Sequence, residues 1–179
     1  EIPGNFEKEH LGKILMESLG RGKRKKKDGA WYAFTRKAKR ASKEIKIGIV
    51  GKYFQTGNFV LADSYLSVIE AVKHAAASEG RKPSILWLSA EDFEIKDGAY
   101  KTNLKKLEEI NGIIVPGGFG GRGVEGKIRV IEYCREHKIP YLGLCYGMQL
   151  MVVEFARNVA KMKDAHTTEI NPKTPTPVI

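Results

Sequence analysis

The sequence predicts an α/β protein with a doubly wound, mostly parallel sheet and helices on both faces of that sheet. Three observations lead to this fold class. Short apolar runs alternate along the chain with stretches of helical periodicity, several of these segments end in glycine, and no internal repeat is visible. The length of 179 residues and the apolar content of 42% are sufficient for one domain with a sizeable core.

The first 44 residues look different from the rest of the chain. Residues 1–20 predict one helix, because Leu11, Ile14, Leu15 and Leu19 follow helical spacing and Gly20 is a plausible stop. The basic run 21–27 could contact nucleic acid or anionic lipid, or it could be a solvated linker. The run holds no aromatic residue, which favours the linker. Residues 30–44 predict a second short helix that leads into the domain.

The positive charge is local. Residues 1–46 hold 14 Lys or Arg against 6 Asp or Glu, whereas residues 47–179 hold 17 against 15. A large basic binding face on the folded part is therefore not expected, and nucleic acid is not a predicted partner.

The remaining elements are predicted in the following order. Strands are expected at 44–51, 84–89, 112–116 and 140–144, and helices at 61–79, around Leu104 and Leu107, at 125–137 and at 147–161. The loop 52–58 lacks a nucleotide-binding fingerprint, residues 90–100 form an acidic loop, and residues 162–179 are a polar, proline-rich tail. The last helix is expected to point these side chains inward: Met148, Met151, Val152, Phe155, Ala156 and Val159.

Cys145 stands in a Gly-x-Cys-x-Gly turn between a short apolar strand and an amphipathic helix. This arrangement is typical of a nucleophile elbow, with sulfur in place of a serine oxygen. A helix N-terminus favours the thiolate, which is the reactive form. The alternative is a structural cysteine after a core strand, and the pentapeptide alone fits both interpretations.

Residues 117–123 contain five glycines and follow the strand that precedes the elbow strand. They could form a flexible loop, but their position favours a nest of N–H groups that binds an oxyanion. With the elbow, this nest predicts acyl transfer through a thioester on Cys145, the oxyanion being held by the N–H groups of Gly118 and Tyr146. None of the four histidines, His10, His74, His137 and His166, is marked by its local sequence as the required base.

The two cysteines form no disulfide framework, and no spacing typical of a zinc site occurs. Cys134 falls on the core stripe of its helix and is expected to be structural. No metal or cofactor is predicted in this domain. No apolar stretch is long enough to span a bilayer and no signal peptide is visible, so a cytoplasmic setting is expected. Because there is no initial Met, the chain is expected to start within a longer polypeptide or after a removed tag.

The motifs 116–120 with 122–127, and 141–149, resemble the class I (triad) glutamine amidotransferases. Within that class, residues 45–179 are similar to the glutaminase domain of the CTP synthases, as also indicated by 49–53, 63–67 and 165–169. Residues 1–44 resemble, more loosely, the end of the synthase domain and a basic interdomain linker. Tyr146 departs from the leucine of that family, and the elbow also resembles that of the GMP synthases.

The resemblance implies that Cys145 takes the γ-glutamyl group of glutamine and releases ammonia. It further implies that Gly118 and Tyr146 form the oxyanion hole, and that glutamine is bound by Gly118, Tyr146, Gly147, Met148, Gln149 and Glu169. The ammonia would pass to the synthase domain of the same chain, which uses ATP and Mg to aminate UTP, with GTP as effector. Family members form homo-oligomers, typically tetramers.

The family's triad His and Glu stand in a His-x-Glu motif beyond the equivalent of Ile179, and its glutamine-binding Arg also lies outside this sequence. The glutaminase domain is therefore expected to be incomplete at its C-terminus, and the fragment inactive or nearly so. Two alternatives remain. One is another triad amidotransferase such as GMP synthase, and the other is a non-catalytic, amidotransferase-like interaction module.

Overall fold

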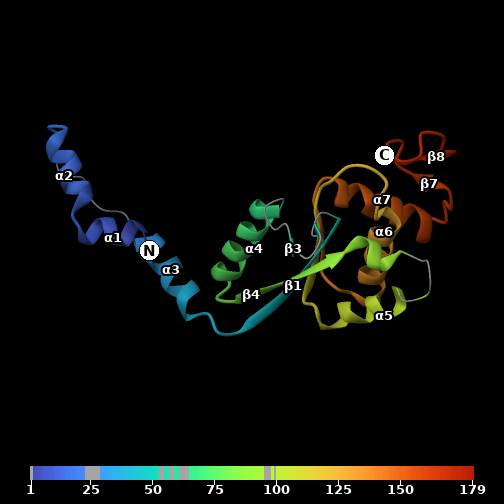
Figure 1. The fold of residues 1–179 in the computed structure, drawn as a ribbon, viewed down its shortest axis with the longest axis horizontal. Helices are drawn as coiled ribbons and strands as arrows, with labels where there is room; N and C mark the ends of the chain where they lie inside the picture. The colour runs from blue at the N-terminus through green and yellow to red at the C-terminus, as the bar shows by residue number, and fades with distance from the viewer. Residues whose placement is uncertain are drawn as a thin grey trace. The chain divides into compact units, whose positions relative to one another are not determined.

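A computed structural model describes residues 2–22, 29–52, 55–56, 59–60, 65–94, 98 and 100–179 of the chain (Figure 1). The contacts divide the chain into two compact units, Glu1–Thr35 and Arg36–Ile179. Most of the basic run 21–27 lies outside the described residues. Within the described part of the chain, no helix is long and apolar enough to cross a membrane.

The first unit begins with two helices where the sequence predicts one. Helix α1 (Ile2–Lys8) and helix α2 (Leu11–Ser18) are separated at His10, whose φ of 59° is left-handed and cannot continue a right-handed helix. The prediction of one continuous helix over 1–20 is therefore wrong, although Gly20 does follow α2 with a φ of 64°. Helix α3 (Gly29–Arg40) confirms the second predicted helix.

The second unit carries the sheet and its helices. In chain order its elements are β1 (Glu44–Gly51), β2 (Gln55–Thr56), β3 (Phe59–Val60), α4 (Leu66–Ser78), β4 (Lys82–Ser89), the 3-10 helix η2 (Ala90–Phe93), α5 (Tyr100–Lys105), the 3-10 helix η3 (Lys106–Glu109), β5 (Gly112–Val115), α6 (Val124–His137), β6 (Tyr141–Gly143), α7 (Tyr146–Asn158), β7 (Ala165–His166) and β8 (Thr176–Pro177). The short pairs β2–β3 and β7–β8 were not predicted, and η2 lies in the predicted acidic loop. Parts of the predicted loop 52–58 and helix 61–79 lie outside the described residues.

The main sheet has the strand order β4-β1-β5-β6, and all of its described pairings are parallel. The chain first moves from β1 to β4 on one side, and then to β5 and β6 on the other. The topological switch point therefore lies between β1 and β5, where a doubly wound sheet opens its ligand crevice. The predicted fold class is confirmed.

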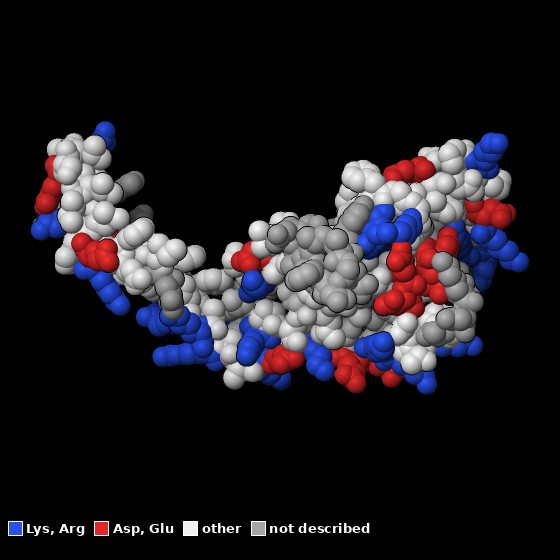
Figure 2. Space-filling view, in the orientation of Figure 1, with Lys and Arg blue, Asp and Glu red and all other residues white. Residues whose placement is uncertain are grey.

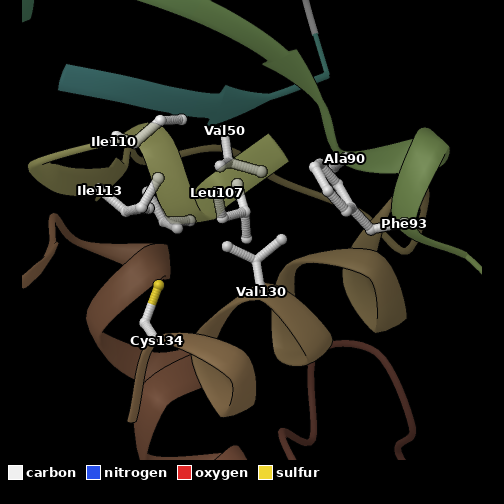
Figure 3. Packing of buried hydrophobic residues seen from close by; sticks show 9 residues of the cluster. Val50, Ala90, Phe93, Leu107, Ile110, Ile113, Val130 and Cys134 are labelled. Carbon is white, nitrogen blue, oxygen red and sulfur yellow. The ribbon is translucent and has the colours of Figure 1, made fainter. Parts of the chain in front are cut away.

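Helices cover both faces of the sheet (Figure 1). On one face Val50 and Ile113 pack against Val130 and Cys134 of α6, and the sulfur of Cys134 points into this cluster (Figure 3). On the other face Ile49 and Ile114 pack with Val72 of α4. Neighbouring strand residues therefore serve opposite faces, as the pleat requires. The buried position of Cys134 confirms its structural role.

Helix α7 packs against α6 through a different face from the predicted one. The side chains that it buries are Tyr146, Leu150, Val153, Glu154 and Ala156. The predicted inward side chains Met148, Met151, Val152, Phe155 and Val159 are exposed, so this prediction is wrong except for Ala156. The elbow sets the rotation of α7 about its own axis at the first residue of the helix. The apolar side chains on the other side of α7 are therefore turned outward.

Candidate active site

Cys145 lies at the junction of β6 and α7 and is exposed. It is the N-cap residue of α7, with a φ of 52° and a ψ of −107°. An L-residue rarely adopts this backbone conformation, which costs on the order of 1–3 kcal/mol and occurs mainly at functional sites. The turn lifts the thiol away from the sheet at the positive end of a helix.

The glycines on either side of Cys145 allow β6, α7 and β5 to approach one another closely. A Cβ added to Gly143 would lie 2.6 Å from the backbone N of Met148, and one added to Gly147 would lie 2.0 Å from the carbonyl oxygen of Val115. Both distances are too short for real atoms, so only glycine fits. The hydroxyl of Tyr141 donates a hydrogen bond of 2.8 Å to the carbonyl of Gly147, which further fixes the turn.

The glycine loop 117–123 follows β5 and lies beside the elbow. The N–H of Leu144 donates to the carbonyl of Val115 at 2.9 Å, which joins the two loops where their strands end. The position of a Cβ on Gly117 is 3.4 Å from the Cβ of Cys145 and 3.9 Å from its Sγ. The structure therefore brings the thiol and the start of the glycine loop, with the half-buried Gly118, into direct proximity.

Tyr146 is the first residue of α7, so its N–H is one of the helical N–H groups without a partner inside the helix. Its side chain is buried, and within the described structure its hydroxyl finds no hydrogen-bond partner. Burial raises the pKa of Tyr146 to about 12, and the carboxylates of Glu169 and Glu125 act in the same direction. The phenol is therefore neutral at physiological pH.

Lys127 lies behind the elbow and was missed by the sequence analysis. Its side chain is 1% exposed, and its Nζ stands 5.6 Å from the centre of the Tyr146 ring, which attracts a cation. Burial, together with a smaller contribution from the charge of Lys52, lowers the pKa of Lys127 to about 8. The sequence did indicate that Lys127 is buried, since it falls on the same helical stripe as Val124 and Ile128.

The remaining predicted glutamine-binding residues lie near the glycine loop or in the first turns of α7. Glu169 is exposed and accepts a hydrogen bond of 3.3 Å from the N–H of Gly120. Gln149 donates its backbone N–H to the carbonyl of Cys145 at 3.2 Å, and Met148 is 49% exposed. Sequence positions 120 and 169 are thus brought together by the fold.

Within the described structure, the contacts of the His166 ring are with residues other than Cys145. Its Nδ1 accepts a hydrogen bond of 2.9 Å from the N–H of Thr167, and its Nε2 stands 3.8 Å from Glu125 Oε1. Burial and the charge of Arg157 lower the pKa of His166, while Glu125 opposes them. His10 belongs to the first unit, His74 lies on α4 and His137 stacks on Tyr133 at the end of α6. No group of three or more His, Cys, Asp or Glu that could hold a metal occurs among the described residues.

The comparisons with known proteins agree with this geometry. Residues 60–174 match the family model "Glutamine amidotransferase class-I", and the chain belongs to this family. Over its whole length it is 50% identical to the CTP synthase of Pyrococcus abyssi, 49% to that of Thermococcus gammatolerans and 46% to that of Sulfolobus acidocaldarius. The chain spans 31%, 32% and 32% of the lengths of these curated relatives, respectively.

A comparison with solved structures also points to a glutaminase domain. The chain resembles the glutaminase domain of Trypanosoma brucei CTPS with bound acivicin, with a TM-score of 0.66 and 36% sequence identity. The match covers 74% of this chain and 48% of that one. The resemblance to the glutaminase domain of the CTP synthases is therefore confirmed.

Proposed function

We propose that the chain is the glutaminase part of a CTP synthase and hydrolyses glutamine within the full-length protein. The observation that carries this proposal is the exposed Cys145 on a strained elbow, beside the glycine loop. The thiolate attacks the side-chain amide carbon of glutamine and forms a tetrahedral oxyanion. The C–N bond then breaks, the nitrogen leaves as ammonia after protonation, and water hydrolyses the resulting thioester to glutamate.

The N–H groups of Gly118 and Tyr146 hold the oxyanion in this reaction. The position of Tyr146 at the start of α7 supports its part, since such an N–H has no partner in the helix and lies at the positive end of the helix dipole. The proximity of Gly117 to Cys145 supports the part of the neighbouring Gly118. N–H groups in place before the reaction lower its barrier because they need no reorganisation.

Glutamine lies between the elbow and the glycine loop, against Gly118, Tyr146, Gly147, Met148 and Gln149. The carboxylate of Glu169 binds its α-ammonium group. The bond from Gly120 N–H to Glu169 Oε1 supports this placement, because it brings the carboxylate to the loop and leaves the second oxygen available for the substrate.

In the full-length protein the ammonia is used by a synthase domain of the same chain, which aminates UTP with ATP and Mg under control by GTP. The similarity to CTP synthases supports this role, along with a homo-oligomeric, cytoplasmic enzyme. The contacts of His166 with Glu125 and Thr167 do not suit a base for Cys145. Residues 1–179 alone therefore hydrolyse glutamine slowly or not at all.

Replacing Cys145 in the full-length protein tests the proposal. Cys145→Ala should lower glutamine-dependent amination of UTP by about 10³-fold or more, because the nucleophile is lost. Amination driven by added ammonia should be unchanged, since it bypasses the glutaminase. Cys134→Ala is the matched control, because Cys134 lies in the core and not at the elbow.

Two outcomes would contradict the proposal. Glutamine-dependent activity that survives Cys145→Ala would exclude the thioester. Amination of XMP in place of UTP would assign the chain to GMP synthase instead.

A further inference from the structure

The end of strand β1 and the glycine loop are bound to each other by contacts in both directions. The ammonium of Lys52, directly after β1, donates to the carbonyl oxygen of Phe119 and, at 3.3 Å, to that of Gly120. In return, Arg122 Nη2 donates to the carbonyl oxygen of Lys52 at 2.8 Å. These contacts bridge β1 and β5 at the switch point of the sheet.

One peptide unit of the loop is held from both ends by opposite charges. The carbonyl of the 119–120 peptide faces the Lys52 ammonium, and the N–H of the same peptide faces the carboxylate of Glu169 at 3.3 Å. In a trans peptide these two groups point in opposite directions, so the two charges fix the rotation of the plane. Hydrogen bonds to charged groups are stronger than those between neutral groups.

Such a restraint matters because the loop has few side chains that could fix it by packing. The side chain of Phe119 is 77% exposed, and the neighbouring positions 117, 118, 120 and 121 are glycines. The orientation of the Gly118 N–H therefore depends on how the following peptides are held. Oxyanion stabilisation is sensitive to this orientation, since the donor must point at the developing charge.

We propose that Lys52 is a positioning residue for the glutaminase reaction. It fixes the 119–120 peptide, and thereby both the N–H of Gly118 and the carboxylate of Glu169, in the arrangement that the substrate needs. This inference rests on the proposed function. It concerns the cationic charge of Lys52, so arginine should replace lysine, whereas methionine, which is similar in length but uncharged, should not.

The test compares two reagents for Cys145 in the full-length protein. Acivicin occupies the glutaminase domain of the trypanosomal relative. Its labelling of Cys145 is expected to need the arranged site, whereas iodoacetamide needs only an accessible thiol. Lys52→Met should lower the rate of acivicin labelling about tenfold or more, because the oxyanion donor is misplaced. It should change the rate with iodoacetamide less than about twofold. Lys52→Arg should restore acivicin labelling to within about threefold.

Lys46→Met is the matched control. It removes a cation from β1, the strand that Lys52 directly follows, but one whose ammonium stands 3.5 Å from the carboxylate of Glu109. Its acivicin labelling should equal that of the unmodified protein. Equal slowing of both reagents by Lys52→Met, or failure of Lys52→Arg to restore the rate, would mean that Lys52 supports only the fold and would overturn the inference.

The two proposals fail in different ways. If glutamine does not protect Cys145 of the unmodified protein against acivicin, the proposed function fails. If glutamine protects Cys145 and Lys52→Met is labelled at the normal rate, only the role of Lys52 fails.

Discussion

Lys127 is a cation that the fold buries almost completely beside the elbow. Its pKa falls from 10.5 to about 8, mainly because burial removes water from the charged form and partly because of the nearby charge of Lys52. The unfolded chain keeps the higher pKa, so between about pH 8 and 10.5 it binds more protons than the folded chain. Stability therefore rises with pH through this window, and the penalty is fully present below about pH 8.

Removing this charge should stabilise the protein at neutral pH. Lys127→Met should raise the free energy of unfolding at pH 7 by about 3 kcal/mol, since a shift of one pKa unit corresponds to about 1.4 kcal/mol. The rise of stability between about pH 8 and 10.5 should disappear with it. Urea unfolding at a series of pH values measures both effects.

The control is Lys101→Met, which removes an exposed lysine from α5 and should leave the pH dependence unchanged. A Lys127→Met variant that retains the full slope above pH 8 would assign the slope to other groups. A variant less stable at pH 7 would show that the cation contributes more to packing and to the Tyr146 ring than its burial costs.

The residues at the site differ in how far the sequence could predict them. Cys145 was visible because the flanking glycines and the strand before it form a local pattern. Lys127 shares its helical stripe with apolar residues, and a lysine there is usually assumed to reach solvent. The contacts of Lys52 could not be predicted, because its partners are the backbone carbonyl groups of Phe119 and Gly120. These residues are distant in the sequence, and every residue has a carbonyl group.

The contact of α7 with β5 depends on the absence of a side chain at Gly147. A Cβ there would lie 2.0 Å from the carbonyl oxygen of Val115, a backbone atom that cannot rotate away. Gly147→Ala should therefore push the helix from the sheet and lower the free energy of unfolding by about 2–3 kcal/mol. Denaturant titration followed by circular dichroism measures the loss.

Gly112→Ala is the matched control for this change. It adds the same methyl group in β5, but its nearest neighbours would be at 3.6 Å, which is ordinary contact. It should therefore cost clearly less than Gly147→Ala. Equal losses for both variants would mean that the close approach at the elbow is not what limits the substitution.

At the level of elements, the existence of strands and helices was more predictable than their orientation. The strands of the main sheet, and the helices that pack on it, lie close to their predicted positions. The face of α7 was not predictable from periodicity, because the helix carries apolar residues on two sides. Only the close approach of Gly147 to Val115, which is a tertiary contact, decides which side is buried.

The outward face of α7 leaves apolar surface open to solvent in the 179-residue chain. Met148, Met151, Val152, Phe155 and Val159 are between 38% and 54% exposed, and Leu142 of β6 is 53% exposed. A cavity of about 570 Å³ lies between α4 and the sheet and is lined mainly by apolar side chains. Exposed apolar side chains gathered on one helix face favour association.

The 179-residue chain should therefore self-associate at micromolar concentrations. The charge of +10 opposes association at low salt, so the effect should grow as salt screens it. Phe155→Glu should shift the chain toward the monomer without lowering its stability, because this side chain is exposed. Sedimentation velocity at low and high salt measures the change.

Leu66→Glu, which charges an exposed position on α4, is the control and should associate like the unmodified chain. A chain that is monomeric at all salt concentrations would contradict the prediction.

The charge pattern of the whole molecule agrees with its sequence. On the visible face of the larger unit, basic side chains are interspersed with acidic ones (Figure 2). The sequence could predict this balance because it follows from composition. It could not predict the short pairs β2–β3 and β7–β8, whose two-residue strands carry too little periodicity to be seen.

The reactivities of the two cysteines can be used to measure how often the folded protein opens locally. Cys145 is exposed in the folded chain, whereas Cys134 is 1% exposed and burial raises its pKa to about 12. A thiol reagent therefore modifies Cys145 from the native state, but reaches Cys134 only when α6 separates from the sheet. The ratio of the two modification rates follows the population of that opened state, without denaturant and without an engineered cysteine.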